Sequence, residues 1–190
     1  MILLLDPSVR MTGALLFYAN RWACTAIPTE HEANKRGIFE GEDDARRVLE
    51  IGRELDRLCG DSRLLATVYA ERPTGAMGAG AHKCLCGGQH SPGLYRSAKA
   101  EGLVLAFVAT WASSRCTEPV RWIAPKDVKK AVLGTASGSK DEMVAELEPV
   151  ARMLGIELPA ARLRREAVCD AIGVGIAAGV IRCPSRTAGS

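Results

Sequence analysis

Three acidic residues each end or interrupt an apolar element of the chain. Asp6 follows the apolar run 1–5, Glu71 follows the apolar run 64–70, and Asp170 lies within an apolar C-terminal segment. A buried carboxylate without a partner is costly, so it is normally compensated by a cation, a hydrogen-bond network or a metal. Carboxylate oxygens are ligands of hard divalent ions. The three residues together predict a divalent-cation site.

Each of these acids has an ordinary alternative explanation when it is taken alone. Asp6 precedes Pro7, and Thr12-Gly13 is predicted to be a turn, where Asp commonly caps backbone donors. Glu71 ends a predicted strand, where it would reach solvent or pair with Arg72. Binding sites in open α/β sheets nevertheless favour the carboxyl ends of strands. The joint arrangement therefore supports the metal site more strongly than any single residue does.

A fourth acid, Glu166, precedes Asp170 by four residues and shares its face of the predicted helix. Two acids on one face of an otherwise apolar helix repel each other unless a cation or a proton intervenes. Arg162 and Arg165 are alternative partners on the neighbouring turns. As ion-pair partners, these arginines compete strongly with a metal for Glu166 and less well for Asp170.

The composition indicates a single globular domain over residues 1–183, with a tail at 184–190. Hydrophobic residues make up 47% of the chain, and the net charge is only +3. Basic residues are nevertheless concentrated, since 72–99 contains four and no acid, which favours a basic face. An odd number of cysteines (seven) and no apolar run long enough to span a bilayer favour a cytoplasmic protein with mostly free thiols, bacterial or in a phage host.

The apolar periodicity predicts a mixed α/β domain with a central five-stranded sheet flanked by helices. The predicted strands cover about 2–6, 14–18, 22–27, 64–71 and 120–124. The predicted helices cover about 42–59, 94–113, 125–133, 140–154 and 162–181, with a kink or break at Pro149. The helix at 94–113 is apolar on most of its circumference, which is typical of a buried helix or a dimer interface.

The arrangement of motifs resembles the RuvC-type Holliday-junction resolvases of the RNase H-like superfamily. The matching segments are 5–8 with Thr12-Gly13, 69–71, 98–102, 128–130 with Gly134 and Lys140, and 170–172, in the order of that family. The resemblance implies an RNase H-like fold and a Mg²⁺-dependent endonuclease, in which Mn²⁺ would substitute. It also implies a homodimer that places symmetric nicks across a four-way DNA junction and leaves a 5′-phosphate.

By the same resemblance, Asp6, Glu71 and Asp170 would be catalytic metal ligands, with Glu166 as the provisional fourth. The family places an acid or a His three residues before its last Asp, where this chain has Ala167. The residues expected to contact DNA are Arg72, Thr74, Lys83, Lys99, Lys129, Lys130 and Lys140. Most lysines of this kind simply lie on the solvent-exposed face of a helix. The functional alternative is that these lysines donate hydrogen bonds to DNA phosphates.

The Gly-rich segment 73–93 is a long predicted loop that contains His82, Cys84, Cys86 and His90. Four such ligands would suit tetrahedral zinc, but Cys-x-Cys departs from the usual Cys-x₂₋₄-Cys spacing. We therefore favour a basic loop that becomes ordered on DNA over a zinc site.

Three other functions remain open. The first is a nuclease for a wider set of branched DNA, such as flaps and forks. The second is a junction-binding protein without catalytic activity. The third is a lobe of an actin-like sugar kinase, which also begins with Asp on its first strand. That class requires a second phosphate-binding Asp-Gly segment and a much longer chain, and neither is present in this sequence, which argues against it.

Overall fold

The computed structural model describes residues 1–8, 10–29, 40–60, 65, 67–72 and 92–182, with the backbone alone for 40–41 and 92–101. These residues form one mixed sheet of five strands in the order β3-β2-β1-β4-β5. β1 pairs antiparallel with β2 and parallel with β4, which confirms the predicted mixed sheet. The strands are β1 (Ile2–Asp6), β2 (Met11–Tyr18), β3 (Arg21–Pro28), β4 (Thr67–Glu71) and β5 (Arg121–Ile123).

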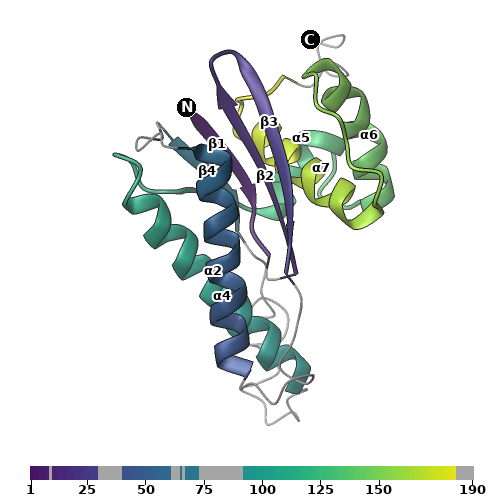
Figure 1. The fold of residues 1–190 in the computed structure, drawn as a ribbon. Helices are drawn as coiled ribbons and strands as arrows, with labels where there is room; N and C mark the ends of the chain where they lie inside the picture. Colours follow the sequence, from purple (N-terminus) through teal and green to yellow (C-terminus); the bar gives the residue numbers. More distant parts are fainter. Residues whose placement is uncertain (9, 30–39, 61–64, 66, 73–91, 183–190) are drawn as a thin grey trace.

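Helices cover both faces of the sheet (Figure 1). Two long helices lie on one face, and three shorter ones lie on the other. The first pair is α2 (Glu40–Cys59) and α4 (Pro92–Ser113). The second group is α5 (Pro125–Leu133), α6 (Lys140–Met153) and α7 (Arg162–Ala177). This three-layer arrangement confirms the α/β architecture predicted from the sequence, a central five-stranded mixed sheet flanked by helices. In the part of the chain that is described, no helix is both long and apolar enough to cross a membrane.

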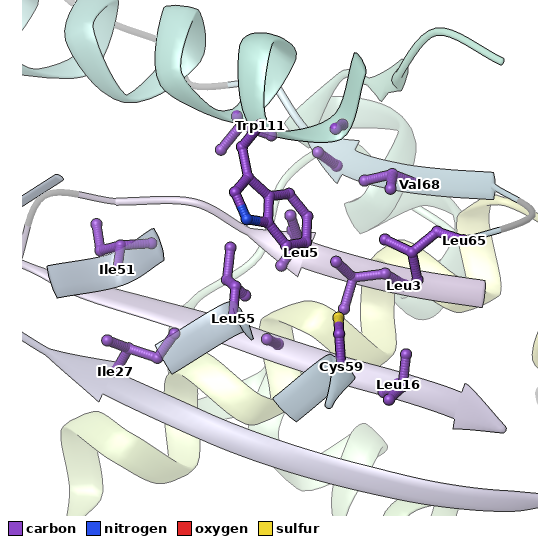
Figure 2. Packing of buried hydrophobic residues seen from close by; sticks show 14 of the residues in the cluster. Leu3, Leu5, Leu16, Ile27, Ile51, Leu55, Cys59, Leu65, Val68 and Trp111 are labelled. Carbon is purple, nitrogen blue, oxygen red and sulfur yellow. The ribbon is translucent and has the colours of Figure 1, made fainter. Parts of the chain in front are cut away.

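Each face of the sheet buries its own apolar cluster. The cluster under α2 and α4 contains Leu3, Leu5, Ile51, Leu55, Val68 and Trp111 (Figure 2). The cluster under α5, α6 and α7 contains Leu4, Val128, Leu147, Val168 and Ile172. Side chains alternate between the two clusters along β1 because successive residues of a strand point to opposite faces.

Several predicted boundaries need correction. Thr12-Gly13 is not a turn, because both residues lie inside β2, where Gly13 pairs with Asp6. α6 passes through Pro149 as one helix, so the predicted break is wrong. α7 ends at Ala177 instead of residue 181, since Gly179 adopts a left-handed φ of 72° just beyond it.

One face of α4 is buried within the chain. Val104, Val108, Trp111 and Ala112 pack into the cluster shared with α2, whereas Leu103 is 38% exposed. Trp111 also donates a 2.8 Å hydrogen bond to Asp56 on α2, which ties the two helices together. Much of the apolar character of α4 is therefore explained by this core. Its role as a dimer interface stays a prediction.

Candidate active site

Strand alternation directs two of the predicted acids toward α7. Along β1, Leu3 and Leu5 face α2 and α4, so Asp6 points to the same side as Leu4. Along β4, Val68 and Ala70 face α2 and α4, which leaves Glu71 on the side of Tyr69. β1 and β4 are parallel and in register up to Leu5 opposite Ala70. Asp6 and Glu71 therefore leave the sheet side by side.

Gly13 allows α7 to approach this end of the sheet closely. A Cβ atom built on Gly13 would lie only 1.9 Å from the carbonyl oxygen of Ala167. Gly13 is the antiparallel partner of Asp6. A side chain at position 13 would hold α7 away from β1 and β2, and with it the third acid, Asp170, which is buried. A glycine inside a strand often marks such a close backbone approach.

The segment after Asp6 is held by the buried residue Thr12. Its hydroxyl donates a 2.8 Å hydrogen bond to the carbonyl of Ser8 and accepts one of 3.2 Å from the Ser8 amide. These two bonds tie Ser8, two residues after Asp6, to Thr12 on β2.

Asp6 and Asp170 meet directly. Burial raises the pKa of Asp6 well above its ordinary value, and the negative charges of Asp170 and Glu71 raise it further. A side-chain hydrogen bond between the two acids also raises the pKa of Asp6 and lowers that of Asp170. Burial also raises the pKa of Asp170, although Lys140 and this hydrogen bond oppose the rise. The buried position and the neighbouring negative charges thus disfavour the ionised form of Asp6.

Glu71 joins this pair through its charge. Burial raises the pKa of Glu71 to about 7, and repulsion from Asp170 contributes, while the positive charges of Lys140 and Lys129 oppose the rise. A glutamate with such a pKa is held in an environment that disfavours its ionised form. A cation would relieve that cost.

Lys140 is the first residue of α6 and forms an ion pair with Asp170. Burial lowers the pKa of its ammonium group, but the charges of Asp170, Asp6 and Glu71 outweigh this effect and raise it. The site therefore contains three carboxyl groups and a positive charge placed among them.

Glu166 has another partner in this structure. Its carboxylate accepts a 2.7 Å hydrogen bond from Arg162, which also contacts Asp141 at 2.9 Å. Arg165 instead contacts Glu148 on α6 at 3.3 Å. Glu166 still affects Asp170 electrostatically. The arginine alternative considered from the sequence is therefore present, and Glu166 as a fourth metal ligand stays a prediction.

The residues expected to contact DNA are only partly described. Arg72 and Lys130 are exposed at the end of β4 and on α5. Lys129 donates a 2.9 Å hydrogen bond to the carbonyl of Gly138. Thr74, Lys83 and the side chain of Lys99 lie outside the described residues, as do His82, Cys84, Cys86 and His90 of the alternative zinc site.

The donor set fits a hard divalent cation, although it is not arranged as a finished metal cage. Carboxylate oxygens are the ligands that such ions prefer, and the Lys140 ammonium already occupies a cation position beside Asp170. Among the described residues, no three His, Cys, Asp or Glu side chains are gathered closely enough to hold an ion as they stand. Metal binding would therefore require local rearrangement of these side chains.

Two features of this site were missed in the sequence. The sequence pattern predicts a turn at Gly13, whereas its position seven residues after Asp6 suits the antiparallel partner strand in which it lies. The ion pair between Lys140 and Asp170 gave no local signal, because the residues are far apart in the chain and meet only through the packing of α6 on α7.

Comparison with known proteins supports the fold. No protein-family model matches the chain, and no curated protein sequence matches it. Among solved structures, Thermus thermophilus RuvC in complex with a Holliday junction substrate has 15% identity and a TM-score of 0.52. That match covers 95% of this chain and 97% of the other. A second T. thermophilus RuvC structure has 18% identity and a TM-score of 0.52, with 94% and 93% covered. The chain thus has the RNase H-like fold of RuvC over nearly its whole length.

Proposed function

We propose that the protein is a metal-dependent endonuclease that resolves four-way DNA junctions by paired symmetric nicks. The observation that supports this most is that Asp6 and Glu71 leave neighbouring strands side by side, near enough to Asp170 on α7 for the three charges to influence one another. They lie in a fold similar to that of RuvC, which has been solved with a Holliday junction. Binding sites in open α/β sheets favour this end of the strands.

In this proposal, the three carboxylates hold Mg²⁺ or Mn²⁺, and Glu166 is available as a fourth ligand. Divalent ions bound by such groups activate water and stabilise the leaving oxygen of a phosphodiester. Other residues of the chain position these carboxylates. Gly13 lets α7 bring Asp170 close to Asp6, and Thr12 ties Ser8, two residues after Asp6, to β2, so metal binding would require rearrangement of the side chains alone.

Positive side chains around the carboxylates would hold the DNA strand. The positive charges of Lys129 on α5 and Lys140 on α6 act on Glu71, and Arg72 follows Glu71 directly at the end of β4. Lys130 is exposed on α5. Lysine and arginine bind phosphate without reading base sequence, which suits recognition of a branched shape. Thr74, Lys83 and Lys99 are proposed to extend this contact.

A junction has two-fold symmetry, so paired nicks require two active sites. We therefore propose a homodimer of this chain. The exposed face of α4, which includes Leu103, is the surface we assign to it. Size measurement by sedimentation should give the mass of two chains, and Leu103→Glu should give the mass of one.

The direct test is cleavage of a labelled synthetic four-way junction in Mg²⁺ or Mn²⁺, compared with a linear duplex and a flap. Symmetric nicks in the junction that disappear in Asp170→Asn would support resolution. Equal cutting of flap and junction would favour a general branched-DNA nuclease. Tight binding of the junction without cutting in either metal would contradict the enzymatic proposal and leave a binding protein.

A further inference from the structure

The Lys140 side chain reaches into the carboxylate cluster from a fixed point on the backbone. Its ammonium pairs with Oδ2 of Asp170 and also interacts with the charges of Asp6 and Glu71. An ammonium placed in this way neutralises part of the negative charge that would otherwise attract a divalent ion.

The backbone at Lys140 is held in place by its neighbours. Ser139 and Glu142 form a capping box, in which the Ser139 hydroxyl accepts from the Glu142 amide at 3.2 Å and the Ser139 amide donates to Glu142 at 2.6 Å. Asp141 pairs with Arg162 on α7 at 2.9 Å. The start of α6 is thus anchored to itself and to the helix that carries Asp170.

The Lys140 side chain, by contrast, is 56% exposed. A long flexible side chain on an anchored backbone can leave one partner for another without refolding. Its position is also unfavourable for the helix, because a positive charge in the first turn opposes the helix dipole. The carboxylate cluster, and not α6, therefore explains why the ammonium lies where it does.

A metal ion and the Lys140 ammonium would compete for Asp170. Both would bind the Asp170 carboxylate, and their positive charges repel each other. A phosphate group of DNA would give the ammonium a different partner outside the cluster.

We propose that Lys140 is a built-in cation that occupies the carboxylate cluster of the DNA-free chain and leaves Asp170 when a divalent ion binds. This inference rests on the proposed metal-dependent function. By linkage, a DNA phosphate that draws Lys140 away strengthens metal binding, and bound metal strengthens DNA binding to the same degree. The chain then loads its metal preferentially when substrate is present.

The test is a titration of the DNA-free protein with Mn²⁺ at pH 8, in which free Mn²⁺ is followed by electron paramagnetic resonance. Lys140→Met keeps the length of the side chain and removes its charge, so we expect its Kd for Mn²⁺ to fall about tenfold. Lys140→Arg keeps the charge and should bind as weakly as the wild type. Circular dichroism verifies that each variant is folded.

Lys126→Met is the matched control. Lys126 is an exposed lysine on α5, so its loss changes the net charge equally without removing a charge from the cluster. Its Kd should stay within about twofold of the wild type, because exposed charges are largely screened. An equal gain in affinity for Mn²⁺ in Lys126→Met and Lys140→Met would overturn the proposal.

The outcomes separate this inference from the proposed function. If Asp6→Asn abolishes Mn²⁺ binding but Lys140→Met binds no more tightly than the wild type, the metal site stands and the role of Lys140 is wrong. If neither the wild type nor Lys140→Met binds Mn²⁺, both proposals are wrong.

Discussion

The two faces of the sheet differ in what their residues do. Under α2 and α4 the strands bury an aliphatic and aromatic cluster, with Leu55 and Ile51 fully enclosed (Figure 2). On the face under α5, α6 and α7, a similar apolar cluster borders Asp6 and Glu71 at the ends of β1 and β4 and Asp170 on α7. The charges of Glu71 and Asp170 disfavour ionisation of Asp6. Substitution should therefore have opposite effects in the two places. Loss of apolar volume lowers stability, whereas loss of a carboxylate charge raises stability and removes function.

The largest effect is expected at Asp6. Asp6→Asn removes a proposed metal ligand, and loss of even an outer-shell partner of a metal typically costs 10–100-fold in activity. We therefore expect junction cleavage to fall by more than about 100-fold. Single-turnover cleavage assays measure this. The melting temperature of the metal-free variant should not fall, and a large drop in both properties would indicate a structural role for Asp6.

The opposite pattern is expected in the apolar cluster at Leu55. Leu55→Ala leaves a cavity beneath α2, so the free energy of unfolding should fall by about 3 kcal/mol. Denaturant unfolding measures the change. At a temperature where the variant stays folded, its rate of junction cleavage should be close to that of the wild type. A large loss of cleavage in the folded variant would show that the two faces are coupled.

Gly13 links the two regions, because it sets the distance between the sheet and α7. Gly13→Ala forces the Cβ atom against the Ala167 carbonyl, and such overpacking should cost about 2 kcal/mol. Displacement of α7 should also move Asp170 away from Asp6, so affinity for Mn²⁺ should fall as well. Calorimetric titration and thermal melting test the two parts. A variant that loses stability with unchanged Mn²⁺ affinity would contradict the positioning role of Gly13.

The smallest effect is expected at Glu71, and it is a gain of stability. Its pKa of about 7 lies above the ordinary value of 4.5, so the folded state binds more protons than the unfolded state between these values. The free energy of unfolding should therefore decrease as pH rises from about 4.5 to about 7.

Glu71→Gln should remove much of this decrease. At pH 8 the metal-free variant should be more stable than the wild type by about 1 kcal/mol, allowing for screening by solvent. Chemical unfolding at pH 5 and pH 8 gives the comparison. Equal pH dependence in the two proteins would show that Glu71 does not carry the raised pKa.

The sheet and the positions of two acids could be predicted from the sequence because they depend on local pattern. Apolar runs that end in Asp6 and Glu71 indicate strands, and the period of two along each strand then fixes the side on which the acids project. The predicted helix boundaries lie close to the observed ones for the same reason, since apolar periodicity and capping residues are local signals. The predicted turn at Thr12-Gly13 is wrong because the sequence does not distinguish a glycine that permits close approach of a helix from a glycine in a turn.

Contacts between distant elements could not be predicted. Arg162 and Arg165 both lie near Glu166 in sequence, so local spacing alone does not decide that Arg162 is the partner. The second contact of Arg162, to Asp141, depends on how α6 packs on α7. The pairing of Lys140 with Asp170 depends on the same packing. Neither arrangement leaves a periodic signal, because tertiary packing decides which charged side chains meet.

The central claim is that Asp6, Glu71 and Asp170 bind one metal centre together. Anomalous diffraction from crystals of the protein soaked in Mn²⁺ tests this most directly, because it locates the ion without reference to activity. We predict a Mn²⁺ peak bounded by these three carboxylates, with the Lys140 ammonium no longer on Asp170. The absence of a peak at saturating Mn²⁺, with Lys140 still paired to Asp170, would contradict the account.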